Sequence, residues 1–248
     1  MKQTIIYNRS CFPMDEVEDN SIALVVTSPP YNVGQEYEEK LSLKEYLYFL
    51  SDVWQKVQKK LIPGGRLAIN IANTGRNPYI SLSSLITQQL NQLGMVQEGE
   101  IIWQKPLASK NSFCAFGSWR MPSNPMLRDT HEYILVFRKD KRRRDISKIP
   151  EDIKNKSRLS KEEFLELHNA TWHMNTASKK GHPCPFPLEL PRRLIKFYTF
   201  EDWDWVMDPF LGSGTTTLAS KELNRSFIGY ETSPKYVQIA KKRVNIST

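Results

Sequence analysis

Residues 24–32 read Leu-Val-Val-Thr-Ser-Pro-Pro-Tyr-Asn, a segment that begins as a strand and stops in a rigid polar turn. The apolar run at residues 22–26 is typical of a buried parallel strand. Pro29 and Pro30 cannot extend a strand ladder, and they fix the backbone φ angle at both positions. The sequence therefore predicts a stiff turn at the carboxyl end of a strand, which is where open α/β sheets bind their ligands.

The predicted turn presents three groups that suit a flat polar ligand. These are the Ser28 hydroxyl, the Pro29 carbonyl and the Tyr31 ring. Taken alone, the turn also fits a strand that simply ends in two prolines, so its interpretation depends on the rest of the chain.

Outward from this turn, strand-like and helix-like segments alternate along the chain. Strands are predicted at residues 4–7, 22–26, 66–71, 96–104, 131–137, 205–210 and 226–231. Helices are predicted near residues 43–61, 80–93, 160–169, 187–199, 215–223 and from 234 onward, with Ser42 and Ser160 opening capping boxes. Such alternation predicts an α/β fold with a mostly parallel, twisted sheet and helices on both faces.

Composition narrows the class of protein. The chain has 248 residues and a net charge of +8, which is compatible with a nucleic-acid partner. Three widely spaced cysteines without a Cys/His cluster argue for a reduced, cytoplasmic protein and against a metal site. We expect no signal peptide and no membrane span.

A second motif lies near the end of the chain, at residues 208–217. Gly212 and Gly214 permit a tight turn between a strand and a helix, and Glu231 ends the next strand roughly 20 residues later, where dinucleotide-binding folds place a ribose-binding carboxylate. A third glycine and a Gly-Lys-Ser/Thr sequence are missing, which excludes a Walker-type phosphate loop. A ribose-bearing cofactor without a phosphate chain fits best, and S-adenosylmethionine is such a cofactor.

Together, the two motifs resemble those of the amino-directed (N4-cytosine or N6-adenine) DNA methyltransferases, in the permuted β-type order. Residues 27–31 resemble the catalytic motif, 208–216 the cofactor motif and 229–231 the ribose carboxylate, while 182–187 and 132–139 match segments that flank them. The resemblance implies a Rossmann-like S-adenosylmethionine-dependent methyltransferase fold with circularly permuted motifs. Residues 1–138 would form the catalytic half, 139–176 a target-recognition insertion and 177–248 the cofactor-binding half.

The resemblance also assigns roles to individual residues. The catalytic set would be Ser28, Pro29, Pro30 and Tyr31, with Ser28 and the Pro29 carbonyl accepting from the target amine while Tyr31 stacks on the base. The cofactor-binding set would be Ser10, Phe186, Pro187, Asp208, Pro209, Phe210, Gly212, Ser213, Gly214, Thr215 and Glu231. Ser10 stands where family members often have an aspartate, which leaves its part in adenine recognition open.

The expected partner is double-stranded DNA, whose target base must leave the stack to be methylated. Basic residues and the loop 105–129 are predicted to hold the duplex; the DNA-binding set is Lys105, Arg120, Arg138, Lys141, Arg142, Arg143 and Arg144. The run 138–144 would also suit a solvated surface. By resemblance we expect a bacterial or archaeal restriction–modification enzyme, with a cognate endonuclease and a homodimer as further possible partners.

Serine at position 28 favours cytosine N4 as the target, because relatives with aspartate there usually methylate adenine N6; adenine is the alternative. Cys184 is predicted to pack internally, since carbon-5 methylation needs a cysteine nucleophile in a different context. Three rivals remain: a methyltransferase for RNA or small molecules, a non-catalytic DNA-binding relative, and a nicotinamide oxidoreductase. The intact 28–31 turn and the missing third glycine disfavour the last two.

Overall fold

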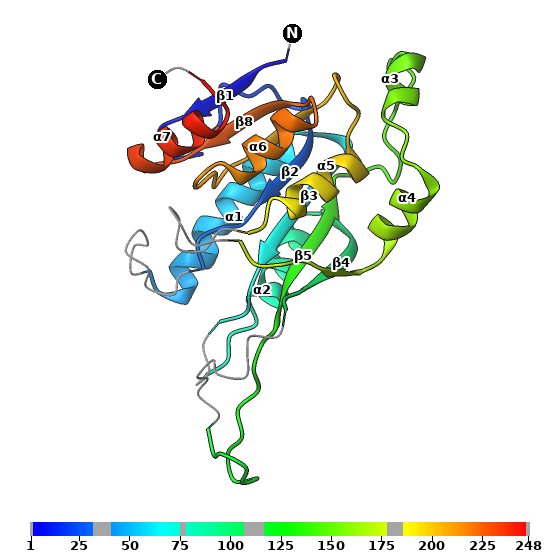
Figure 1. The fold of residues 1–248 in the computed structure, drawn as a ribbon. Coiled ribbons are helices and arrows are strands. Elements are labelled where there is room, and N and C mark those ends of the chain that lie inside the picture. Colours follow the sequence, from blue (N-terminus) through cyan, green and yellow to red (C-terminus); the bar gives the residue numbers. More distant parts are fainter. Residues whose placement is uncertain (1, 32–40, 75–77, 107–116, 178–185, 247–248) are drawn as a thin grey trace.

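The computed structural model describes residues 2–31, 41–74, 78–106, 117–177 and 186–246, and it contains one mixed sheet flanked by helices (Figure 1). The strand order is β1-β8-β7-β2-β3-β5-β4-β6. The strands are β1 (Thr4–Tyr7), β2 (Ile22–Thr27), β3 (Leu61–Ile71), β4 (Val96–Gln104), β5 (His131–Arg138), β6 (Thr171–His173), β7 (Trp205–Asp208) and β8 (Ser226–Tyr230). The predicted α/β fold with a mostly parallel sheet is confirmed.

Strand β5 is the exception to the parallel arrangement. It pairs antiparallel with both β3 and β4, whereas each of the other strand pairs in this sheet is parallel. The chain passes from β4 to β5 through the segment 105–130, and β5 returns in the opposite direction. The carboxyl ends of β2, β3, β4 and β7 therefore share one edge of the sheet with the start of β5; we call it the catalytic edge.

Helices cover both faces of the sheet, as predicted. They are α1 (Leu43–Lys60), α2 (Leu82–Gln92), α3 (Glu151–Lys156), α4 (Lys161–His168), α5 (Glu189–Tyr198), α6 (Thr215–Glu222) and α7 (Pro234–Arg243). Val25 of β2 packs with α1 and α2 in one apolar cluster, whereas its neighbours Leu24 and Val26 pack with α5 and α6 in the other. Within the described ranges, no helix is both long and apolar enough to span a bilayer.

Both predicted capping boxes are present. The Ser42 hydroxyl accepts from the Glu45 amide at 3.3 Å, and the Glu45 carboxylate accepts from the Ser42 amide at 2.8 Å. Ser160 and Glu163 form the same pair of bonds at 3.1 and 3.2 Å. Each box satisfies backbone donors that the first turn of a helix leaves unpaired, which fixes where α1 and α4 begin.

Strand β3 begins earlier than the sequence predicted. The strand was predicted at residues 66–71, but β3 already includes Pro63, Gly64 and Gly65. Gly64 has a φ angle of 81°, and a Cβ atom there would lie 2.9 Å from the Arg144 backbone. The glycine thus makes an irregularity inside the strand, matched by a register shift in β2, and lets the chain after β5 pack against it.

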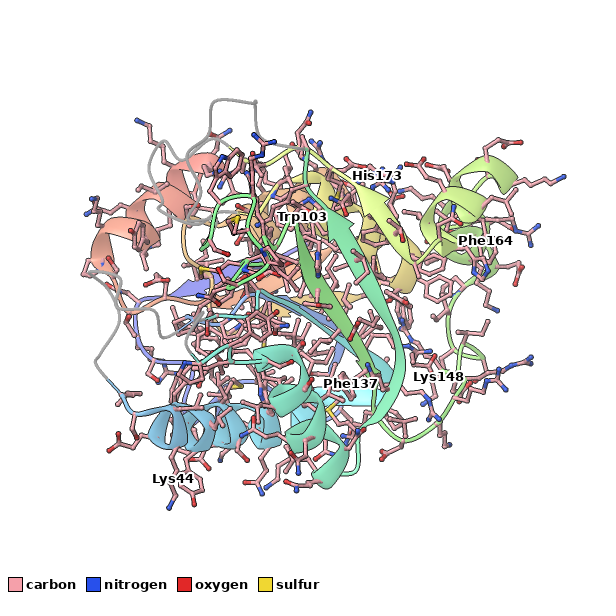
Figure 2. The ribbon with its side chains drawn as sticks, turned by 90° about the horizontal axis from the view of Figure 1, so that it is seen from below. Lys44, Trp103, Phe137, Lys148, Phe164 and His173 are labelled. Atoms are coloured by element: carbon pink, nitrogen blue, oxygen red, sulfur yellow. The ribbon has the colours of Figure 1, made fainter. Side chains whose placement is uncertain are left out.

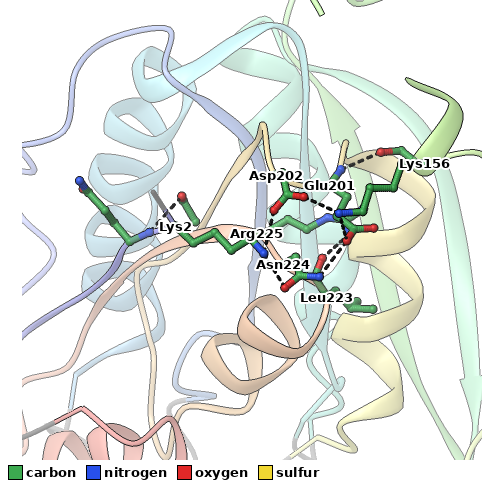
Figure 3. A network of polar contacts seen from close by, with 10 residues as sticks. Lys2, Lys156, Glu201, Asp202, Leu223, Asn224 and Arg225 are labelled. Carbon is green, nitrogen blue, oxygen red and sulfur yellow. Dashed lines mark hydrogen bonds and ion pairs between the residues drawn. The ribbon is translucent and has the colours of Figure 1, made fainter. Parts of the chain in front are cut away.

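The segment 139–176 extends the main fold rather than standing apart from it. β6 adds a strand beside β4, in which Trp172 pairs with Trp103 and His173 with Gln104 (Figure 2), and the Trp172 side chain is buried in the main core. Helix α3, which the sequence did not predict, is fastened by Lys156. Its ammonium group lies 2.9 Å from Glu201 and 2.5 Å from Asp202 (Figure 3).

Beyond β5, the chain is held by a buried ion pair. The Arg144 guanidinium donates two hydrogen bonds to the Asp204 carboxylate, which is 3% exposed and also accepts from the Phe200 amide at 2.7 Å. The bidentate geometry suits a buried pair, because it satisfies both carboxylate oxygens at once. This pair ties the start of the 139–176 segment to the turn that precedes β7.

We predict that Asp204→Asn lowers the free energy of unfolding by about 3 kcal/mol, because it leaves the Arg144 charge buried without its partner. Urea denaturation monitored by circular dichroism measures the loss. The matched control is Glu151→Gln, which removes an exposed pair with Lys154 and should cost under about 0.5 kcal/mol. Equal, small losses in both variants would contradict a structural role for the buried pair.

Candidate active site

The turn at residues 28–31 lies at the catalytic edge, directly after the central strand β2. Pro29 is buried, and the Pro30 carbonyl accepts a hydrogen bond from the Tyr46 hydroxyl of α1 at 2.7 Å. A buried proline and an anchored carbonyl leave the backbone little freedom. These contacts agree with the predicted stiffness of this turn, and helix α1 contributes one of them.

Hydrogen bonds orient the Ser28 hydroxyl within the turn. Ser28 donates to the Tyr31 hydroxyl oxygen at 3.0 Å, and the Tyr31 hydroxyl donates to the Glu132 carboxylate at 3.1 Å. A hydroxyl has one hydrogen and two lone pairs. Because the Ser28 hydrogen is directed to Tyr31, the Ser28 oxygen remains an acceptor for an incoming N–H group.

Two further residues hold this chain of hydrogen bonds. Asn70 of β3 donates to the Tyr31 hydroxyl oxygen at 3.1 Å and to Glu132 at 2.6 Å, and Lys105 donates to the other Glu132 oxygen at 2.6 Å. Burial, and then the nearby Glu132 charge, raise the pKa of Tyr31 well above its ordinary value. Tyr31 therefore stays a neutral phenol that can donate.

The sequence patterns did not assign Asn70 or Glu132 to the site. Both residues lie in strands that were predicted correctly, but they meet only because β5 pairs antiparallel with β3. A polar Asn in an apolar strand and a Glu at a strand's start were the available signals. Buried polar side chains need partners, so such residues are candidates for a network.

Asp208 joins the catalytic strand to the glycine-rich turn. Its carboxylate accepts from the Thr27 hydroxyl at 2.7 Å, the Thr216 hydroxyl at 2.9 Å and the Phe210 amide at 3.0 Å. The residue is 1% exposed, and burial raises the pKa of its carboxyl to about 6 against the effect of these donors. Its carboxylate is held by internal donors, and its predicted place in the cofactor-binding set stays a prediction.

The glycine-rich turn is built as the sequence predicted. Gly212 has a φ angle of 53°, and its amide donates to Glu231 at 2.9 Å. Gly214 has a φ angle of 81°, and a Cβ atom there would lie 2.7 Å from the Ala240 side chain, so only glycine lets α6 start this close to α7. Arg243 of α7 donates to the Ser213 carbonyl at 3.0 Å and to the Thr215 hydroxyl at 3.3 Å.

Glu231 fits the role of a ribose-binding carboxylate. One of its oxygens accepts from the Gly212 amide and the other from the Ser233 amide at 2.8 Å, so the group is held in place while lone pairs remain for ligand hydroxyls. Asn8 donates to the Glu231 carbonyl at 3.0 Å, which brings the 8–11 segment beside this carboxylate. Ser10, in that segment, is exposed and accepts from the Phe12 amide at 3.2 Å.

Other members of the predicted cofactor set occupy different surroundings. The partly buried Phe210 ring packs against Phe49 and Trp54, with ring centroids 5.9 and 6.3 Å apart, and its predicted cofactor contact stays a prediction. Pro209 and Pro187 are buried, and Phe186 packs on the apolar cluster under α5. Cys184 and most of the 182–187 motif lie outside the described residues.

The basic run 138–144 follows the carboxyl end of β5, at the edge of the sheet opposite the Ser28 turn. Arg138 pairs with Arg66 near the start of β3, about 20 Å of strand away from the catalytic edge. Arg138 also binds Glu98 at 2.5 Å. The antiparallel return of β5 carries the run away from the Ser28 turn, whereas Lys105 lies beside the turn. DNA contacts by Arg138, Lys141, Arg142, Arg143 and Arg144 stay a prediction.

Comparison with known proteins gives a consistent result. The family model described as DNA methylase matches residues 22–242. The Type II methyltransferase M.MjaI of Methanocaldococcus jannaschii is 34% identical over 273 residues, covering 94% of this chain and 88% of the relative. The Type II methyltransferase M.MthZI of Methanothermobacter thermautotrophicus is 30% identical, covering 97% of this chain and 76% of the relative.

Solved structures share the fold. A DNA modification methylase of Thermus thermophilus, TTHA0409, solved in complex with S-adenosyl-L-methionine, matches with a TM-score of 0.78 and 28% identity, covering 98% of this chain and 93% of that one. The PvuII DNA methyltransferase, which is cytosine-N4-specific, matches with a TM-score of 0.73 over 100% of this chain and 89% of that one. At 23% identity, this second match concerns the fold alone.

The pKa of Asp208 predicts a pH-dependent stability difference between the wild type and Asp208→Asn. The folded state binds the Asp208 proton more tightly than the unfolded state does, because the pKa of an aspartate in the unfolded chain is about 3.9. Lowering the pH through about 6 should therefore stabilise the wild type relative to the variant, until the gain levels off near pH 4. Urea denaturation of both proteins at a series of pH values measures this difference, and a difference independent of pH would contradict the buried, raised-pKa carboxyl.

Proposed function

Since the chain belongs to the DNA methylase family of S-adenosylmethionine-dependent enzymes, we propose that it is a site-specific DNA methyltransferase for the exocyclic N4 amine of cytosine in duplex DNA. The supporting observation is the oriented Ser28 hydroxyl, an uncharged acceptor at the position where adenine-directed relatives usually carry a carboxylate. The Glu231 carboxylate and the glycine-rich turn support the cofactor assignment.

The cofactor would lie between Glu231 and the turn at residues 212–215. S-adenosylmethionine supplies a methyl group bonded to a positively charged sulfur. Glu231 would hold the ribose hydroxyls, because its two oxygens are already fixed by backbone donors. Asp208 would also act indirectly, because its hydrogen bonds to Thr27 and Thr216 keep the cofactor turn next to the catalytic turn.

The catalytic turn acts on the amine itself. An exocyclic amine is a poor nucleophile because its lone pair is delocalised into the base. The Ser28 oxygen and the Pro29 carbonyl would accept hydrogen bonds from its two N–H groups, which favours a pyramidal nitrogen. This nitrogen would attack the methyl carbon as the bond from that carbon to sulfur breaks, and the methylated amine would then release one proton. Tyr31 would stack on the base, and its fixed hydroxyl keeps Ser28 oriented. Preorganised acceptors and close approach supply the acceleration.

The DNA must present its target base out of the stack to reach this turn. Lys105 and Arg120 remain the proposed phosphate contacts, since Lys105 lies beside the site and Arg120 is exposed on the 105–130 segment. Such contacts make binding weaken as the salt concentration rises. A cognate endonuclease and a homodimer are further proposals, and both follow from the family resemblance.

Ser28→Ala tests the proposed function. We expect kcat for labelled methyl transfer to duplex DNA to fall by about 100-fold or more, because one of the two preorganised acceptors is lost. Binding of S-adenosylmethionine, measured by calorimetry, should not change. The control is Ser84→Ala, an exposed serine on α2 outside the site. Normal activity of Ser28→Ala, or a wild type that methylates RNA but not DNA, would overturn the proposal.

Glu132→Gln tests the positioning of Ser28 through Tyr31. We expect kcat to fall by about tenfold with an unchanged KM for S-adenosylmethionine, because the carboxylate is the acceptor that orients the Tyr31 hydroxyl. Tyr31→Phe should have a similar effect, and the double variant should lose much less than the product of the two, since both act through one chain of hydrogen bonds. Multiplicative losses would show that Glu132 acts independently of Tyr31.

A further inference from the structure

The segment between β4 and β5 carries a surface that the catalytic site does not use. It leaves the sheet at the catalytic edge, because β4 ends there and β5 begins there. Its described part, residues 117–130, extends away from the body of the molecule as a long narrow projection (Figure 1). A projection of this kind lies in the path of any duplex whose base reaches Ser28.

The root of the projection is fixed to the catalytic network. The Lys105 amide donates to the Thr130 carbonyl at 2.9 Å, and the Gln104 side chain donates to the Thr130 carbonyl and hydroxyl at 3.1 and 3.2 Å. Two residues after Thr130, Glu132 binds Tyr31 and Lys105. The direction in which the projection leaves the sheet is therefore set by the same residues that hold the catalytic turn.

The far end of the projection is an ordered turn. Gly117 bridges to Pro125, the Ser118 amide donates to the Asn124 carbonyl at 2.9 Å, and the Ser118 hydroxyl accepts from the Asn124 amide at 2.8 Å. A Cβ atom on Gly117 would lie 2.1 Å from the Asn124 oxygen, so this close approach needs a glycine. The turn presents its side chains from a defined backbone.

Large apolar side chains on this projection face solvent. Leu127 is 94% exposed, and Trp119 and Met121 are 65% and 63% exposed. Arg120 stands between the latter two, and the chain as a whole carries a charge of +8. Apolar side chains interspersed with arginine match DNA, because the phosphates attract the arginine and the base stack accepts an apolar wedge.

The position of Leu127 along the projection matches the base stack. Leu127 precedes His131, the first residue of β5, by four residues, which span at most about 13 Å when fully extended. DNA grooves are about 8 Å deep. If the backbone of a duplex touches the catalytic edge, a side chain at this distance from the sheet can reach the bases. The turn at 118–124 lies farther from the sheet and would follow the groove.

We propose that Leu127 is the wedge that enters the base stack when the target base rotates into the Ser28 turn, with Trp119 and Met121 lying in the groove beyond it. The wedge occupies the gap that the extruded base leaves, and so favours the extruded state. This inference rests on the proposed methyltransferase function and adds to it a residue that acts on the duplex rather than on the amine.

The test compares two duplexes that carry the recognition site of the protein, one with a paired target base and one with the target opposite an abasic position. Leu127→Ala should lower kcat/KM on the paired duplex by about tenfold, because extrusion of a paired base costs a few kcal/mol that the wedge helps to offset. On the abasic duplex, where the target is already unpaired, the loss should be under about twofold.

The matched control is Val96→Ala, which shortens an apolar side chain that is 40% exposed at the start of β4, away from the catalytic edge, and it should leave both rates unchanged. Equal losses on the two duplexes, or none on the paired one, would overturn the wedge. So would a shift in sedimentation coefficient on Leu127→Ala, because the side chain would then contact a second copy of the chain. A wild type that methylates neither duplex contradicts the proposed function and the wedge with it.

Discussion

The hydrogen bond between Thr27 and Asp208 joins the two halves of the site, although the residues lie 181 positions apart in the chain. Strands β2 and β7 are parallel neighbours, so their carboxyl ends come side by side. Asp208 accepts from the catalytic strand through Thr27 and from the start of α6 through Thr216. A buried carboxylate needs such donors, and its position therefore fixes the spacing between the catalytic turn and the cofactor turn.

A second polar network builds the acceptor side of the site. Glu132 on β5 and Asn70 on β3 hold Tyr31, which orients Ser28, and Lys105 at the end of β4 balances the Glu132 charge. These residues lie on or beside neighbouring strands of the sheet, so their relative positions are fixed by strand pairing. The Ser28 hydroxyl is thereby held in one orientation. The same strand ends carry the projection that bears Leu127. The proposed wedge and the proposed acceptors of the amine are therefore held by the same part of the sheet.

Local sequence patterns predicted the features that depend on neighbouring residues. Capping boxes at Ser42 and Ser160, the stiff turn after β2 and the left-handed glycines at 212 and 214 are set by backbone chemistry close in sequence. Features set by distant pairing were missed. The antiparallel direction of β5 places the basic run 138–144 at the far edge and brings Glu132 to Tyr31. No local sequence pattern indicates this direction. Burial of the Asp208 carboxylate likewise depends on its partners on two other elements.

The central claim is that the oriented Ser28 hydroxyl directs methylation to cytosine N4. The most direct measurement is mass spectrometry of nucleosides from duplex DNA that the purified protein has modified with S-adenosylmethionine, after complete enzymatic digestion. Our account predicts N4-methylcytosine as the modified nucleoside. N6-methyladenine in its place would contradict it.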